Sequence, residues 1–267
     1  KTFADGGILS GSAYMLEPWG ASDVHAISDT EYRGKLFLQS ARLQAMIVAA
    51  LRAGLQFTSH AVGDGAVTEV VNAFEVVNRS LPVKGSRSSV THSNFVSPSV
   101  IQKMAAMDIV ADIQPAWFYL DSAALLRQFG EERLRYFQPL SSLYAAGIVV
   151  AGGSDHWSMD ESRDAVNPFN PFLSMWVTIS RQPRYVDRPL YPAEALSRRQ
   201  AVEMLSMNAA YALSREKELG SIEPGKFADF ILVDRNVLTC ALEDLPETRV
   251  MQTYLAGELV YDAGRDM

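Results

Sequence analysis

The sequence predicts an α/β protein built on a parallel sheet. Strand-like and helix-like segments alternate repeatedly along the 267 residues, a pattern that favours parallel strands joined by helices. Three of the strand-like segments lead into a chemically active side chain, at His60, His92 and Asp155. Because the carboxyl ends of parallel strands form the active-site rim of barrel enzymes, we expect these three side chains at one rim.

A short strand and a long helix open the chain. Residues 2–5 have the pattern of a strand, and a glycine-bearing loop that contains His25 follows to about residue 28. Apolar residues then recur every three to four positions within residues 31–53. This spacing predicts a helix that Gly54 closes.

The next two units carry the histidines. Residues 55–60 form a strand that delivers His60, and Asp64 is expected to cap the helix that follows. A similar segment ends in His92. One strand, one helix and two loops need roughly 30 residues, so the two histidines are expected on neighbouring parallel strands.

The middle of the chain leads to Asp155. Ser97 and Pro98 are suited to begin a short helix, since serine can cap free amides and proline fits the first helical position. Residues 109–115 form the next strand, and a helix-rich stretch covers 119–146. The apolar run after it is the fifth strand of the series and delivers Asp155 at its end.

The last part of the chain changes character. Residues 157–192 form a long connection rich in aromatic residues and proline, which we expect to bind substrate. Helices follow to about residue 213. From residue 219 onward the chain is turn-rich, with β-like runs at 230–233, 250–255 and 258–261. We therefore divide the chain into a segment of 1–218 and a small β domain of 219–267.

Composition and charge exclude several classes of protein. With 48% hydrophobic and 21% charged residues, the chain is neither disordered nor fibrous. A net charge of −7 without a basic cluster argues against nucleic-acid binding. No apolar run approaches the ~20 residues of a membrane helix. The single cysteine, Cys240, excludes an internal disulfide and favours a cytoplasmic location.

The residues at the expected rim suggest a metal site with a pocket beside it. Imidazole nitrogens of His60 and His92 and the carboxylate of Asp155 are good ligands for zinc and related divalent ions. Trp117, Tyr119 and Trp157 follow strand ends, where they either line a substrate pocket or pack in the core. His156 either points into the pocket beside the metal or lies outside it.

Five motifs in order resemble the amidohydrolase superfamily, most closely its amidohydrolase-3, or YtcJ-like, branch. They are HAVGD (60–64), THSNF (91–95), GSDHW (153–157), MNAAYAL (207–213) and SIEPGKFADFILVD (221–234). The resemblance covers nearly the whole chain. It implies a (β/α)8 TIM-type barrel, of which this chain holds about strands 4–8, and a β-sandwich made from both ends of the protein.

The resemblance also assigns roles to the site residues. His60 is implied as the metal ligand after the fifth strand, His92 as the ligand after the sixth, and Asp155 as ligand and proton shuttle after the eighth. Lys1 matches the family lysine that is carbamylated to bridge two metals. The implied cofactor is one or two divalent ions, of which zinc is the leading candidate.

One family feature is absent from the sequence. Members carry a His-x-His pair on the first barrel strand, and no such pair occurs in these 267 residues. Five strands cannot close an eight-stranded barrel. We therefore expect a missing N-terminal segment or a second chain to complete the barrel, and we expect a homo-oligomer on general grounds.

The implied activity is hydrolysis of a non-peptide amide or a related C–N bond of a small molecule. A metal-activated water would attack the carbonyl, with Asp155 as its base. The aromatic connection favours a partly apolar or aromatic substrate, such as an N-substituted formamide or an acyl amide. Two alternatives stay open: a non-catalytic barrel fragment that serves as an interaction module, and a metal-dependent deaminase or isomerase.

Overall fold

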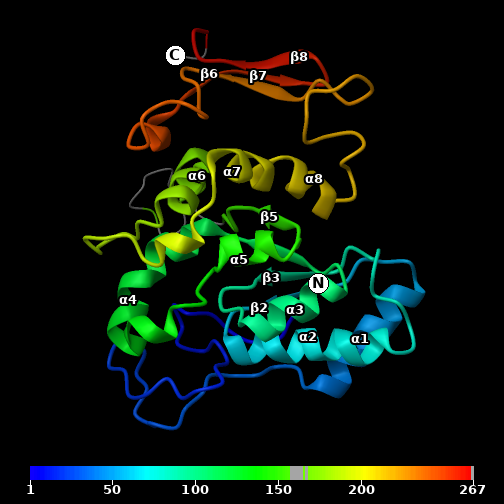
Figure 1. The fold of residues 1–267 in the computed structure, drawn as a ribbon, viewed down its shortest axis with the longest axis vertical. Coiled ribbons are helices and arrows are strands. Elements are labelled where there is room, and N and C mark those ends of the chain that lie inside the picture. Colours follow the sequence, from blue (N-terminus) through cyan, green and yellow to red (C-terminus); the bar gives the residue numbers. More distant parts are fainter. Residues whose placement is uncertain (157–164, 166–167, 266–267) are drawn as a thin grey trace.

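A parallel sheet of five strands forms the centre of the computed structural model, which describes residues 1–156, 165 and 168–265 (Figure 1). All neighbouring strands are parallel, and their order in the sheet follows the sequence. The α/β prediction is therefore confirmed. The strands are β1 (Thr2–Phe3), β2 (Thr58–Ala61), β3 (Ser89–His92), β4 (Val110–Ile113) and β5 (Val150–Gly152).

The register of the sheet sets the two histidines close together. His60 of β2 pairs with Phe3 of β1 on one side and with Thr91 of β3 on the other. His92 is the last residue of β3 and pairs with Ala61. Both side chains thus stand at the C-terminal ends of adjacent parallel strands.

Three helices cover one side of this sheet (Figure 1). They are α1 (Ser40–Arg52), α2 (Asp64–Asn78) and α3 (Pro98–Ala106). Their apolar faces and the strands form one buried cluster that includes Ile47, Phe74 and Met104. Burial of large side chains at roughly 25 cal/mol per Å2 is the main force that holds these helices on the sheet.

The start of the first helix corrects the sequence prediction. The helix begins at Ser40, whereas the apolar spacing predicted a start at Glu31. The backbone of this stretch pairs with the first strand region instead, since Phe37 N donates to Ala4 O at 2.7 Å and Leu36 bridges Asp5. Long-range hydrogen bonds therefore override the local helical pattern.

The predicted cap of α2 is wrong by one residue, and the predicted cap of α3 is right in position but makes no capping hydrogen bond. Gly63, not Asp64, is the N-cap of α2, and the Asp64 carboxylate accepts from Leu16 N at 2.8 Å. Pro98 stands at the start of α3 as predicted. The Ser97 side chain does not cap that helix, because its hydroxyl bonds to Ser99 at 3.1 Å.

A second group of helices encloses the other core. It contains α4 (Pro115–Arg133) and α6 (Pro171–Ser180), whereas α5 (Leu140–Ala145) packs with the first core through Leu140 and Leu143. The stretch predicted as a long connection thus contains a helix, which Asn170 caps by accepting from Phe172 N at 2.8 Å. Trp19, Phe118 and Phe137 are fully buried between these helices and the N-terminal loop.

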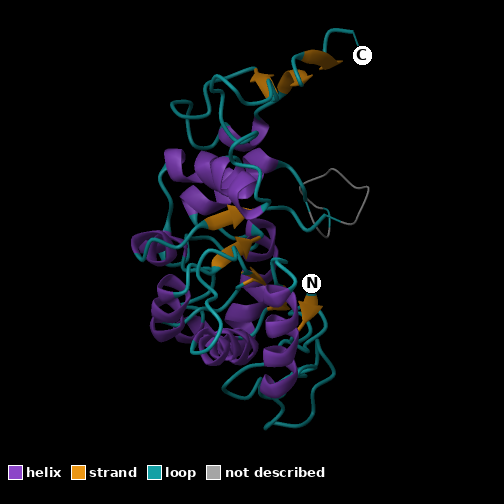
Figure 2. Cartoon of the chain, turned by 90° about the vertical axis from the view of Figure 1, so that its right-hand side faces the viewer, coloured by secondary structure: helices purple, strands orange, loops and turns teal. Residues whose placement is uncertain are grey.

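The C-terminal residues form a separate antiparallel sheet of three strands at the far end of the molecule (Figures 1 and 2). Its strands are β6 (Phe230–Val233), β7 (Val250–Leu255) and β8 (Glu258–Asp262). Between the two sheets lie α7 (Arg198–Leu205) and α8 (Met207–Ala212). The short 3-10 helix η1 (Pro192–Glu194) lies against α5, and η2 (Leu245–Glu247) precedes β7.

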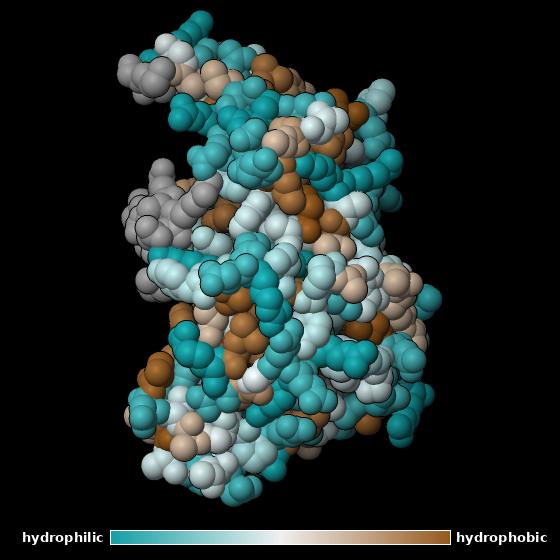
Figure 3. Space-filling model, turned by 60° about the vertical axis from the view of Figure 1, so that its left-hand side comes forward, coloured by the Kyte–Doolittle hydropathy of each residue, from teal (hydrophilic) through white to brown (hydrophobic). Residues whose placement is uncertain are grey.

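Leu245 attaches this end of the chain to the helices. It is fully buried against Phe172, Met175 and Ala201. Hydrophobic residues are exposed along this end of the molecule (Figure 3). Within the described ranges, none of the helices is long and apolar enough to cross a bilayer.

Candidate active site

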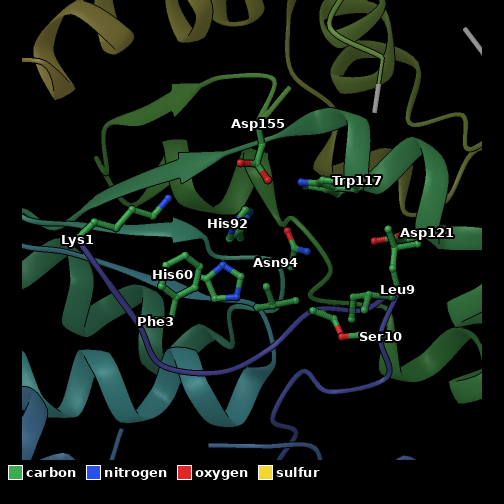
Figure 4. Close-up of a pocket in the computed structure, with 13 residues that line it drawn as sticks. Lys1, Phe3, Leu9, Ser10, His60, His92, Asn94, Trp117, Asp121 and Asp155 are labelled. Carbon is green, nitrogen blue, oxygen red and sulfur yellow. The ribbon is translucent and has the colours of Figure 1, made fainter. Parts of the chain in front are cut away.

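A cavity of about 310 Å3 opens at the C-terminal ends of the parallel strands (Figure 4). This volume lies at the lower end of the range of small-molecule sites. Lys1, His60, His92 and Asp155 all line it. The structure therefore brings the four predicted metal-binding residues to one cavity.

His92 is buried, His60 is partly buried, and the two rings are in contact. Their ring centroids lie 4.5 Å apart at an interplanar angle of 78°. Burial lowers the pKa of His60, and it lowers the pKa of His92 to about 3, with the neighbouring His60 and Lys1 charges acting in the same direction. Both imidazoles are thus neutral at pH 7 and offer a lone pair to a ligand.

The backbone beside these groups is strained. His92, Ser93 and Asp155 have φ values of 75°, 43° and 53°, in the left-handed region that residues other than glycine seldom adopt. Ser93 N donates to Ala61 O at 3.1 Å, and the Ser93 hydroxyl donates to Val90 O at 3.0 Å. Strained backbone conformations that surrounding hydrogen bonds maintain are common at functional sites.

Asp5 lies next to His60 and fixes the loop after β1, and the sequence analysis did not identify it as a site residue. Its carboxylate is fully buried and accepts from Tyr14 N at 2.9 Å, Val62 N at 3.0 Å and Gly63 N at 2.9 Å. Its Oδ1 lies 3.6 Å from His60 Nε2. Burial raises the pKa of Asp5 to about 7, although its backbone hydrogen bonds oppose this rise.

His60 is positioned by the same loop. Its Nε2 lies 3.0 Å from Gly6 O, one residue after Asp5. The Phe3 ring packs against the imidazole with centroids 4.9 Å apart, and Lys1 Nζ lies 5.8 Å from the Phe3 ring centroid. β1 and the loop after it thus contact Lys1 and His60 at the cavity.

The predicted substrate-binding residues separate into two groups. Trp117 lines the cavity. Tyr119 packs against Trp176 with ring centroids 6.3 Å apart, and His156 packs against Phe169 at 4.4 Å, so neither ring belongs to the cavity wall. Trp157 lies outside the described residues.

Two further polar residues of the wall, Asn94 and Asp121, were not predicted. Asn94 O accepts from Gln138 N at 2.6 Å, which ties the chain two residues after His92 to the segment just before α5. Asp121 follows Trp117 by four positions on α4, and residues four apart share a helix face. The four-residue spacing could have identified Asp121 from the sequence, because Trp117 was already a predicted pocket residue.

Comparison with known families identifies the family of this chain. The model of the amidohydrolase family matches residues 1–261. The chain belongs to the amidohydrolase family. The membership suggested by the ordered motifs is therefore confirmed.

Two curated relatives cover most of this amidohydrolase chain. An N-substituted formamide deformylase from Arthrobacter pascens is 29% identical over 231 residues, which are 86% of this chain and 41% of the relative. The putative amidohydrolase YtcJ from Bacillus subtilis is 25% identical over 264 residues, 98% of this chain and 46% of the relative. This chain therefore spans less than half of each relative's length.

A solved structure shows the same fold. An uncharacterized metal-dependent hydrolase from Pyrococcus furiosus superposes with a TM-score of 0.71 at 22% identity, over 89% of this chain and 44% of that one. At this identity the likeness concerns the fold. The five-stranded parallel sheet of this chain corresponds to part of that larger protein.

The donor set of the amidohydrolase cavity fits a divalent metal in chemistry. Two neutral imidazoles and the Asp155 carboxylate face the same space, with the Lys1 side chain beside them (Figure 4), and imidazole nitrogen and carboxylate oxygen suit zinc. Across the described residues, no group of three His, Cys, Asp or Glu side chains is close enough together to hold an ion. Further donors would have to complete the shell.

Proposed function

We propose that this chain forms part of the catalytic centre of a metal-dependent hydrolase that cleaves a non-peptide amide or a related C–N bond of a small molecule. The observation that carries this proposal is that His60, His92, Asp155 and Lys1 line one cavity. Membership of the amidohydrolase family supports it.

Each residue has a distinct role in this proposal. His60 and His92 would hold the metal through neutral ring nitrogens, and Lys1, if carbamylated, would supply a further ligand. Asp155 takes a proton from the attacking water and passes it to the leaving nitrogen. When bound, a zinc ion lowers the pKa of water to about 7 and polarises the scissile carbonyl.

The other side chains of the cavity select the substrate. Phe3, Leu9 and Trp117 offer apolar surface beside the donors, which suits a small amide with an apolar or aromatic body. The Arthrobacter relative is named for N-substituted formamides, and we propose an N-substituted formamide or acyl amide as the substrate class.

We also propose that the ligand set is completed outside this chain. A further N-terminal segment or a second chain would supply the remaining ligands and close the sheet. The span of less than half of the relatives' length supports this proposal.

Metal content and activity test the proposal together. We expect His60→Ala and His92→Ala to remove bound zinc, measured by elemental analysis of the purified protein. Asp155→Asn should lower kcat for N-benzylformamide by about 100- to 10,000-fold, the usual contribution of a general acid or base. His25→Ala is the matched control, because His25 bonds to Ser22 at 3.0 Å and does not line the cavity.

The outcomes are distinct. Unchanged zinc content in both histidine variants would contradict the assigned ligands. Unchanged kcat in Asp155→Asn would contradict its role as base. Release of ammonia from an aminopurine, without cleavage of any amide, would favour the deaminase alternative, and a protein that binds no metal would favour the non-catalytic one.

A further inference from the structure

Asp121 is a buried carboxyl group without a partner in the cavity wall. Its residue surface is 3% exposed. No hydrogen bond or ion pair joins its side chain to any of the described residues, and burial alone raises its pKa, to about 7. A buried carboxylate without a partner lowers the stability of the fold. This cost indicates that Asp121 serves to bind a ligand, which the free protein lacks.

The carboxyl group lies at the far end of the cavity. In Figure 4, Lys1 and His60 stand at one side and Asp121 at the other, with Asn94 and Trp117 between them. Asp121 therefore lies apart from the histidines, where the scissile amide bond of the proposed substrate binds. It faces the part of a substrate that is remote from that bond.

The surroundings of Asp121 specify the chemistry of what it binds. Trp117 and Leu9 lie beside it and offer apolar surface, and the nearby Ser10 hydroxyl is hydrogen-bonded to Gly7 O and Ser12 Oγ (Figure 4). Among the described residues of the wall, Lys1 carries the positive charge, and it stands at the opposite end. An ionised carboxylate in such surroundings is stabilised most by a cationic hydrogen-bond donor.

We propose that Asp121 is a specificity-determining residue that binds a protonated amine at the end of the substrate remote from the scissile amide. This inference rests on the proposed amidohydrolase function and narrows its substrate class. The substrate is then an amide with an apolar body and a basic group at the far end. The amine donates to the carboxylate, while the amide carbonyl reaches the histidine end.

A matched pair of compounds tests this. N-formyl-4-(aminomethyl)benzylamine carries an ammonium group where N-formyl-4-ethylbenzylamine carries a methyl group of nearly equal size. We expect the metal-loaded wild type to favour the amine compound in kcat/KM by about 10- to 100-fold, the range of a charge-assisted hydrogen bond. Asp121→Asn should remove this preference by slowing the amine compound only. Asp23→Asn, at an exposed position of the N-terminal loop, should keep the preference.

A binding measurement separates this proposal from the proposed function. Calorimetry with Asp155→Asn protein gives the Kd of both compounds without turnover. Tighter binding of the amine compound that disappears in Asp155→Asn/Asp121→Asn supports the role of Asp121, even where wild type cleaves neither compound and the hydrolase proposal fails. Equal binding of both compounds, no binding of the amine compound, or a preference that survives Asp121→Asn overturns it.

Discussion

We expect Asp5→Ala to lose much stability, because the Asp5 carboxylate accepts hydrogen bonds from three backbone amides. The substitution leaves the amides of Tyr14, Val62 and Gly63 without their acceptor, and those of Val62 and Gly63 are buried. An unsatisfied buried donor costs about 1 to 3 kcal/mol. Removal of a carboxyl group whose pKa burial raises to about 7 recovers part of that loss. We expect a net loss of about 2 to 5 kcal/mol in the free energy of unfolding.

Urea denaturation followed by circular dichroism measures this loss. Asp5→Asn should lose less than Asp5→Ala, since the Asn oxygen still accepts from one or two amides while its NH2 group faces a donor. Asp23→Ala serves as the control, because Asp23 is an exposed residue of the loop that follows Asp5. Loss of the loop anchor should also weaken zinc binding, because Gly6 of this loop contacts His60.

The refuting result is equally specific. An Asp5→Ala protein that unfolds within about 0.5 kcal/mol of wild type, the usual range of surface substitutions, would show that these hydrogen bonds do not hold the loop. A loss as large in Asp23→Ala would show that the loop is sensitive to any change. Either result would remove Asp5 as the support of His60.

Two further predictions concern buried charges. Arg181 is 1% exposed, donates to three backbone carbonyls at 2.9 to 3.2 Å, and its guanidinium carbon lies 3.8 Å from the Phe118 ring centroid. Arg181→Met should therefore lower the free energy of unfolding by about 3 to 5 kcal/mol. Arg127→Met, on the exposed side of α4, is the control and should change the free energy of unfolding little. Asp121→Asn should give a pH-dependent gain. Since the folded-state pKa of Asp121 is raised to about 7, wild-type stability falls as pH rises from about 4 to 7, so the variant's advantage should grow over that window by up to about 4 kcal/mol. Denaturation series at pH 4.5 and 8 check this, and an advantage equal at both values would contradict the raised pKa.

Local sequence patterns are enough to predict the strands and the residues at their ends. β2 and β3 carry His60 and His92 near their C-terminal ends, and β5 precedes Asp155. The spacing of β2 and β3 leaves room for one helix between them. Parallel pairing then places the strand ends at one edge whatever the details of the helices. For this reason the sequence alone predicted both the sheet and the histidine pair.

Other features depend on contacts between residues far apart in the chain. The helix predicted from Glu31 starts at Ser40, because residues 36 and 37 bond to the β1 region. The α6 helix arises where a loop was expected, since Asn170 and Pro171 begin it and its apolar face packs on buried neighbours. Such competition between local propensity and tertiary hydrogen bonds is not visible in a single sequence.

The Asp5 and Asp121 carboxyl groups show which features of the site cannot be predicted from the sequence. By itself, the sequence determined the fold class, the family motifs and the rim to which His60, His92 and Asp155 belong. Only the tertiary structure decided that Asp5 receives three amides from distant segments and that Asp121 faces the cavity. The reason is physical: strand order follows from patterns within a few residues, but whether a carboxylate is buried, paired or left facing a ligand depends on how separate elements pack.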